Sequence, residues 1–161
     1  MQAARLKGTR NLADTMLIGL PSLLGPEFLF ALRSMGHGDE IALVDGNYPA
    51  QDHARRLVRT DGHGMVAVLE AILAVLPLDT EGGAAILRAG LGNRVDGIGD
   101  IHRSIDALCA RLRPGMAVQA LEGAALYPRI RAAHTVVATS ETALYANVIL
   151  RKGVLVPQPP P

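Results

Sequence analysis

His37 and Asp45 stand on either side of a short apolar segment, Ile41 to Val44. Four apolar residues in a row are typical of a strand that is covered on both faces of a sheet. His37 lies between Gly36 and Gly38, and glycines suit a tight turn or the close approach of a ligand. Asp45 directly follows the strand, at the edge where open α/β sheets usually bind ligands. A histidine and an aspartate placed in this way could take and give protons.

Each of these two residues has a chemical and a structural interpretation. An imidazole titrates near pH ~6.5, so His37 suits proton transfer in either direction at neutral pH. It could equally be a turn residue bonded to backbone. Asp45 could bind or exchange a proton, or it could close the turn at Gly46 and Asn47 as an Asx-turn carboxylate. Both roles of Asp45 are compatible, because a carboxylate has two oxygens.

Tyr145 and Asn147 form a second candidate pair near the end of the chain. They lie in the segment 144–150, whose pattern predicts a strand, and residues two apart in a strand project from the same face. A phenol and an amide side by side can hydrogen-bond the vicinal hydroxyls of a sugar. The alternative is a tyrosine packed in an interface beside an asparagine at a strand edge.

These four residues lie in segments that resemble the fucose mutarotase / ribose pyranase family. The segments are MGHGDEI at 35–41, with Asp45 after it, and ETALYANVILRKGVL at 141–155. The resemblance extends over 20–154, most of the chain. It implies an enzyme of the isomerase class, a monosaccharide mutarotase that interconverts the anomers or ring forms of a free sugar, fucose-like or ribose-like, without a cofactor.

The resemblance also implies roles and partners. His37 would be the principal acid/base. Asp45 would bind the sugar and tune His37, and Tyr145 and Asn147 would bind and orient the ring. The family builds its sugar site where subunits meet, in ring-like homo-oligomers that are decamers in several members. We therefore expect a homo-oligomer, with a decamer as the favoured size and the site at the subunit interface.

One position departs from the family pattern. The family usually carries an arginine or histidine shortly after the preceding strand, as a further sugar contact, and the matching residue here is Gly123. Glu122, Tyr127, Arg129 and Arg131 are the nearby side chains that could replace it. The departure leaves two functions open, a mutarotase or a non-catalytic sugar-binding or regulatory protein that retains the pocket.

Composition narrows the class of protein. The net charge is +1, which gives no electrostatic footprint for nucleic acid. Tryptophan is absent and aromatic residues make up 3%, so few stacking platforms for sugars are expected. The single cysteine, Cys109, excludes an internal disulfide and fits a reducing compartment, so we expect a cytoplasmic protein. No segment is long and apolar enough to span a bilayer.

The histidines show no metal-ligand spacing, and no metal is expected. His53 follows Asp52 in the loop after Asp45 and could lie near the site. The other three, His63, His102 and His134, are expected in solvent or in turns.

Apolar periodicity and turn residues predict alternating strands and helices, hence one α/β domain with a largely parallel sheet and flanking helices. The predicted helices are 26–35, 64–76, 102–112 and 128–133. The predicted strands are 41–44, 57–60, 84–87, 117–121, 135–139 and 144–150. The glycine-rich segment 89–100 is predicted to be a flexible loop.

The predicted helix 64–76 is apolar nearly all round, with Glu70 as the interruption. Such a helix is buried in a core or at a subunit contact. The domain is expected over 16–156. Residues 1–15 are predicted to be a disordered extension, and 157–161 a proline-rich tail.

Overall fold

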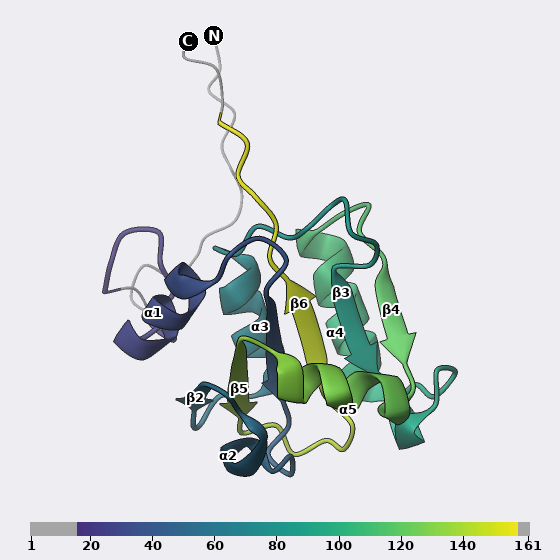
Figure 1. Cartoon of the computed structure of the whole chain (residues 1–161). Coiled ribbons are helices and arrows are strands. Elements are labelled where there is room, and N and C mark those ends of the chain that lie inside the picture. The colour runs from purple at the N-terminus through teal and green to yellow at the C-terminus, as the bar shows by residue number, and fades with distance from the viewer. Residues whose placement is uncertain (1–15, 158–161) are drawn as a thin grey trace, which may run out of the picture.

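Six short apolar segments pair into one mixed sheet, shown in Figure 1. The computed structural model describes residues 16–157. The strands lie in the order β2-β5-β1-β6-β3-β4, and β6 runs antiparallel to both of its neighbours while the other pairs are parallel. The predicted α/β fold with a largely parallel sheet is therefore confirmed. The strands are β1 Glu40–Val44, β2 Leu57–Thr60, β3 Ile86–Ala89, β4 Val118–Leu121, β5 Thr135–Thr139 and β6 Val148–Arg151.

Helices cover both faces of the sheet. One face packs against α1 (Pro26–Ser34), α3 (Met65–Leu73) and α4 (Asp100–Leu112). The other packs against α2 (Ala50–His53) and α5 (Gly123–Ala132), and α5 crosses in front of the sheet in Figure 1. Because the sheet is covered on both sides, the central strands β1, β5 and β6 are almost continuously buried, whereas the edge strands β2 and β4 each carry an exposed polar residue.

The central strand β1 contributes to both apolar layers. Ile41 and Leu43 pack among the residues of α1, α3 and α4, whereas Ala42 and Val44 pack on the side of α2 and α5. All four side chains are fully buried. The two ends of β1 therefore emerge from the core at opposite edges of the sheet.

The predicted strand 144–150 is wrong in its first half. The strand begins at Val148, and Leu144 and Tyr145 form a turn in which Tyr145 has a positive φ of 61°. The positive φ breaks the extended backbone that the apolar pattern predicts. Tyr145 and Asn147 therefore do not share a strand face.

The predicted helix 128–133 is too short, because α5 begins at Gly123 and runs through Pro128. Proline favours the first turn of a helix, which is why the sequence places the start at Pro128. Inside a helix, proline removes the hydrogen bond to the carbonyl four residues earlier. Here that carbonyl belongs to Ala124, and both residues are exposed, so water can solvate it.

The apolar helix α3 is buried within the chain itself. Six of its nine residues are buried, between the sheet and the helices beside it. The strand β3 begins two residues later than predicted, and the segment 89–100 contains a short 3-10 helix, η2 (Leu91–Asn93). Within residues 16–157, no helix has the length and apolar character needed to cross a membrane. The extension 1–15 and the tail residues 158–161 lie outside the described residues.

Candidate active site

Asp45 lies at the carboxyl end of β1, and three hydrogen bonds hold its carboxylate and its N–H. Its Oδ1 accepts the Asn47 N–H at 2.9 Å, and its Oδ2 accepts the Ala146 N–H at 3.2 Å. The N–H of Asp45 donates to Oδ1 of Asn147 at 3.0 Å. Each carboxylate oxygen keeps a second lone pair for a ligand. The Asx-turn interpretation is thus confirmed, and the carboxylate stays available for binding.

Tyr145 and Asn147 reach the same place by a turn and not by a strand face. The turn brings Tyr145 to Asp45 through the hydrogen bond from the next residue, Ala146. A non-glycine residue with positive φ must be held by its surroundings. Here the fully buried His102 bonds the carbonyl oxygen of Tyr145. The expectation that His102 lies in solvent or a turn is wrong.

A cavity of about 380 Å³ opens over Asp45 and Asn147. All three tyrosines of the chain, Tyr48, Tyr127 and Tyr145, line it. The rings of Tyr48 and Tyr127 stack with centroids 6.1 Å apart and planes inclined by 16°. Few aromatic residues are present, but the fold gathers the tyrosines at one point and so provides the apolar and hydrogen-bonding surface that a sugar ring needs.

His53 also lines this cavity and lies 3.0 Å from the Tyr48 hydroxyl, Nδ1 to oxygen. Burial raises the pKa of Tyr48, against the opposing charge of Arg131. Burial also raises the pKa of Tyr127, and the nearby Asp45 adds to it. Both phenols therefore stay protonated at neutral pH and can donate or accept hydrogen bonds.

The two arginines of α5 lie in different places. Arg131 lines the cavity at its exposed rim, whereas Arg129 forms an ion pair with Glu40 at the other edge of the sheet. Among the residues that could replace a basic side chain at Gly123, the cavity contains Tyr127 and Arg131. Gly123 itself is buried at the first position of α5.

His37 lies away from this cavity. It precedes β1, whereas Asp45 follows it, and five residue steps from Glu40 to Asp45 at ~3.3 Å each span roughly 16 Å. The side chain of His37 is half exposed, with Nε2 3.5 Å from Oδ1 of Asp79. The Glu81 amide, together with Arg151 and His37, lowers the pKa of Asp79 to about 2. Within one chain, His37 and the cavity therefore lie at opposite ends of β1.

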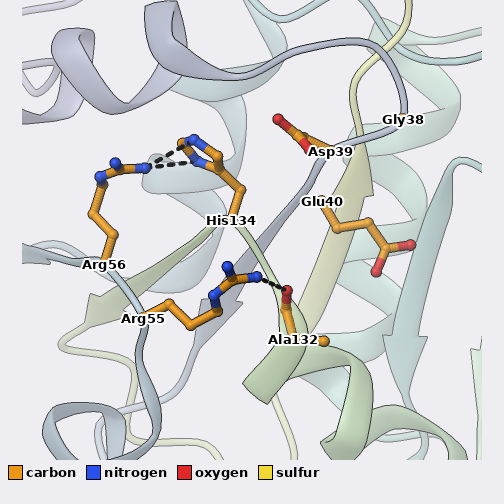
Figure 2. A pocket seen from close by; sticks show the side chains of 7 residues that line it. All are labelled: Gly38, Asp39, Glu40, Arg55, Arg56, Ala132 and His134. Carbon is orange, nitrogen blue, oxygen red and sulfur yellow. Dashed lines mark hydrogen bonds between the residues drawn. The ribbon is translucent and has the colours of Figure 1, made fainter.

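A second cavity, of about 460 Å³, opens at the same edge as His37 (Figure 2). Arg55, Arg56 and His134 lie on one side of it, with Asp39 and Glu40 across from them. Arg56 contacts both ring nitrogens of His134, and burial and the positive charge of Arg56 lower the pKa of His134. Opposite charges balance across this cavity, so it offers no net charge to a ligand.

In the described part of the chain, no three His, Cys, Asp or Glu side chains gather as a metal site would require. The side chains that line the first cavity carry imidazole, carboxylate, phenol and amide groups, which can transfer protons and form hydrogen bonds.

The profile of the RbsD / FucU transport protein family matches residues 18–155. The chain belongs to this family. Relatives in the family include human fucose mutarotase, which is 42% identical over 149 residues covering 89% of this chain and 97% of the relative. The L-fucose mutarotase of Glaesserella parasuis is 37% identical over 141 residues, with coverage of 86% and 96%.

Solved structures of the RbsD / FucU family share the fold as well. The crystal structure of the fucose mutarotase of Streptococcus pneumoniae in complex with L-fucose superposes with a TM-score of 0.77. It is 36% identical and covers 87% of this chain and 100% of that chain. The resemblance drawn from the two sequence segments is therefore confirmed over nearly the whole domain.

Proposed function

We propose that this chain is a cofactor-independent mutarotase of a free monosaccharide, with L-fucose as the preferred candidate. Asp45, Tyr145 and Asn147 hold the sugar in the cavity. His37 of a second subunit supplies the acid/base. The observation that carries this proposal is the separation of His37 from the cavity, because two half-sites at opposite edges of one sheet can act together only across a contact between subunits.

The relatives support the choice of reaction and sugar. Proteins named fucose mutarotase or L-fucose mutarotase align with at least 86% of this chain at 36% to 42% identity. The structure with bound L-fucose belongs to a protein 36% identical to this one.

Mutarotation needs one proton removed from the anomeric hydroxyl and one given to the ring oxygen. The bond between the anomeric carbon and the ring oxygen breaks, and the open aldehyde forms. Rotation and reclosure on the other face of the carbonyl give the other anomer, with both protons returned. Positioned proton transfer typically contributes ~10²–10⁴-fold, which suits a reaction that already proceeds in water.

The groups around His37 fit this task. Asp79 has a pKa of about 2, so it is ionised at neutral pH beside Nε2 of His37. A carboxylate there favours a hydrogen on Nε2 and leaves Nδ1 to exchange protons in the neutral ring. His37 is half exposed in one chain, so it is accessible to a sugar held by a neighbour.

Exposed apolar side chains on both faces of the sheet support a neighbour. Leu144, beside Tyr145 at the cavity, is 59% exposed, and Phe30, on α1 at the other face, is 66% exposed. Exposed large apolar side chains are common at interfaces. We propose a closed homo-oligomer, a decamer by analogy with the family, and a cytoplasmic location. Light scattering at micromolar concentration measures the assembly, and a monomeric mass would contradict the shared site.

Saturation-transfer NMR on L-fucose, D-ribose and D-galactose tests the activity directly. We expect faster anomer exchange for fucose than in buffer, and His37→Ala should abolish the increase while circular dichroism stays unchanged. Binding of the sugar without faster exchange would instead identify a non-catalytic sugar-binding protein.

Mixing variants tests whether the site is shared. His37→Ala and Asp45→Asn should each be inactive alone. Refolded together in equal amounts, they should regain activity at about one quarter of the sites, where an intact His37 faces an intact cavity. The control mixes each variant with the double variant that carries both changes, which has neither half-site to contribute. Absence of recovery in oligomers of normal mass would argue against a shared site.

A further inference from the structure

The space that a side chain at residue 123 would fill is occupied by Asn93. A Cβ built on Gly123 would lie 2.8 Å from both Cγ and Oδ1 of Asn93, and 3.0 Å from Cε2 of Tyr127. Distances this short require the neighbour to move. Any side chain at residue 123 and the present position of Asn93 therefore exclude each other.

A tight loop holds Asn93 in place. Asn93 ends the 3-10 helix η2, has a φ of 61°, and donates its N–H to the Gly90 carbonyl at 3.0 Å. Asparagine adopts this left-handed conformation more readily than most residues. The Leu91 N–H donates to the Gly97 carbonyl at 3.0 Å and closes the loop. A Cβ on Gly90 or Gly97 would collide with loop backbone, so both positions require glycine.

From this loop, Asn93 bonds a residue of the sugar cavity. The Tyr127 hydroxyl donates to Oδ1 of Asn93 at 3.0 Å. The Tyr127 ring is fixed on its other side by the stacked ring of Tyr48. A phenol has one hydrogen to donate. Because Asn93 takes that hydrogen, the lone pairs of the Tyr127 oxygen remain for an incoming hydroxyl.

We propose that Asn93 is a positioning and specificity-determining residue of this sugar site. It takes the place of a side chain at residue 123 and turns Tyr127 into a hydrogen-bond acceptor. The site then selects a sugar that presents a hydroxyl donor to Tyr127. This inference rests on the proposed function, since it concerns the same cavity.

The variants are Asn93→Leu, which has similar size and no acceptor, and Asn93→Asp, which keeps the acceptor oxygen. Leucine tolerates the positive φ of residue 93 less well than asparagine or aspartate, so the deoxy sugars below separate loop strain from loss of the acceptor. One neutral hydrogen bond corresponds to about a 2- to 12-fold change in affinity. We expect Asn93→Leu to raise KM for fucose by that factor with kcat little changed. Asn93→Asp should stay near the wild-type KM. An equal loss in both variants would overturn the acceptor role.

Deoxy sugars show whether the effect passes through one hydroxyl. Exchange is measured for fucose and for its monodeoxy analogues with the wild-type protein and with Asn93→Leu. One analogue should lack the hydroxyl that donates to Tyr127. We expect the wild-type protein to have a raised KM for this analogue, and Asn93→Leu to raise it no further. A uniform increase for every analogue would indicate loosened structure and would overturn the proposal.

Gly123→Ala gives an independent test of the excluded space. The new methyl group should displace Asn93, so the variant should reproduce the KM change of Asn93→Leu, and the double variant should be no worse than either alone. Additive losses would contradict a shared cause.

Calorimetric fucose binding by the same variants separates this inference from the proposed function. Wild-type protein that binds fucose without exchanging anomers would refute the mutarotase activity, and the Asn93 effect on affinity would still decide this inference. Wild-type protein that neither binds nor exchanges would refute both.

Discussion

The imidazole of His102 donates from Nε2 to the main-chain oxygen of Tyr145 across 3.0 Å, and its Nδ1 accepts the Gly99 N–H at 3.0 Å. Because Nδ1 is an acceptor, the hydrogen of the neutral ring must lie on Nε2. The first bond joins residues 43 apart in the sequence. It fastens the start of α4 to the turn that presents Tyr145 with a positive φ.

His102→Leu should therefore loosen the Tyr145 turn. The change removes the partners of the part-buried Tyr145 carbonyl and Gly99 N–H. An unsatisfied buried group costs about 1–3 kcal/mol, and these partly exposed groups should cost less because water can reach them. We expect unfolding at lower urea concentration and a raised KM for the sugar. The exposed His63 provides the control, because His63→Leu should change neither quantity. A normal KM in a destabilised His102→Leu protein would show that the bond serves the fold alone.

Asp79 should make the stability of the protein depend on acid pH. Its folded-state pKa of about 2 lies below the ~3.9 of an unfolded aspartate. The stability that ionised Asp79 contributes is therefore complete above about pH 4 and is lost as the pH falls through 2. Urea unfolding of the wild type and Asp79→Asn should show a stability difference that is constant from pH 7 to 4 and shrinks towards pH 2.

The matched control for Asp79 is Asp61→Asn. The Arg59 side chain lowers the pKa of Asp61 too, but this pair is exposed, and surface pairs contribute little to stability. A stability difference for Asp79→Asn that stays the same down to pH 2 would disprove the assignment.

Arg131 and Arg129 should differ in sugar binding. Arg131→Ala removes a charged donor from the cavity rim, and hydrogen bonds to charged groups are worth about 1.5–3 kcal/mol. Because Arg131 is exposed, we expect a loss at the lower end of this energy range, which corresponds to about a 10-fold loss of fucose affinity. Arg129→Ala should leave affinity unchanged, because Arg129 pairs with Glu40 elsewhere. Calorimetry with fucose compares the two. Equal losses would mean that charge near α5, and not contact, governs binding.

Cys109 should be unreactive in the folded protein. It is fully buried, and desolvation, with Asp106 adding to it, raises its pKa to about 11. The thiolate is the reactive form, so little is present at pH 8. A thiol reagent should modify Cys109 only as fast as the protein unfolds, and the rate should rise with urea. Rapid modification in buffer would contradict the burial.

Sequence reasoning works best for segments whose structure follows from their own residues, such as a short run of apolar side chains. The apolar run 41–44 and the strand 135–139 lie where expected, because strands covered on both faces need continuous apolar residues. The strand 57–60 also lies where expected, although its Arg59 is exposed. The family resemblance is equally local, since two short motifs carry it.

The cavity could not be predicted in the same way. Tyr48 and Tyr127 lie far apart in sequence and meet through the packing of α5 on the sheet, which leaves no periodic signal. The positive φ of Tyr145 depends on His102 and Asp45, and both are distant in the chain. The sequence places His37 and Asp45 at the two ends of one strand, but it does not show that the cavity forms at the Asp45 end alone.

The antiparallel pairing of β1 with β6 sets the distance between the two half-sites. The turn after His37 is bonded to the end of β6, through Gly38 and Lys152, and the start of β6 lies beside Asp45. Two hydrogen-bonded strands thus form a rigid spacer between His37 and the cavity of the same chain. In the closed ring that we propose, the length of these strands sets the spacing of the active sites. One added residue in β1 would shift the half-sites by ~3.3 Å and reverse the facing of every side chain beyond it, so neighbouring subunits would no longer match.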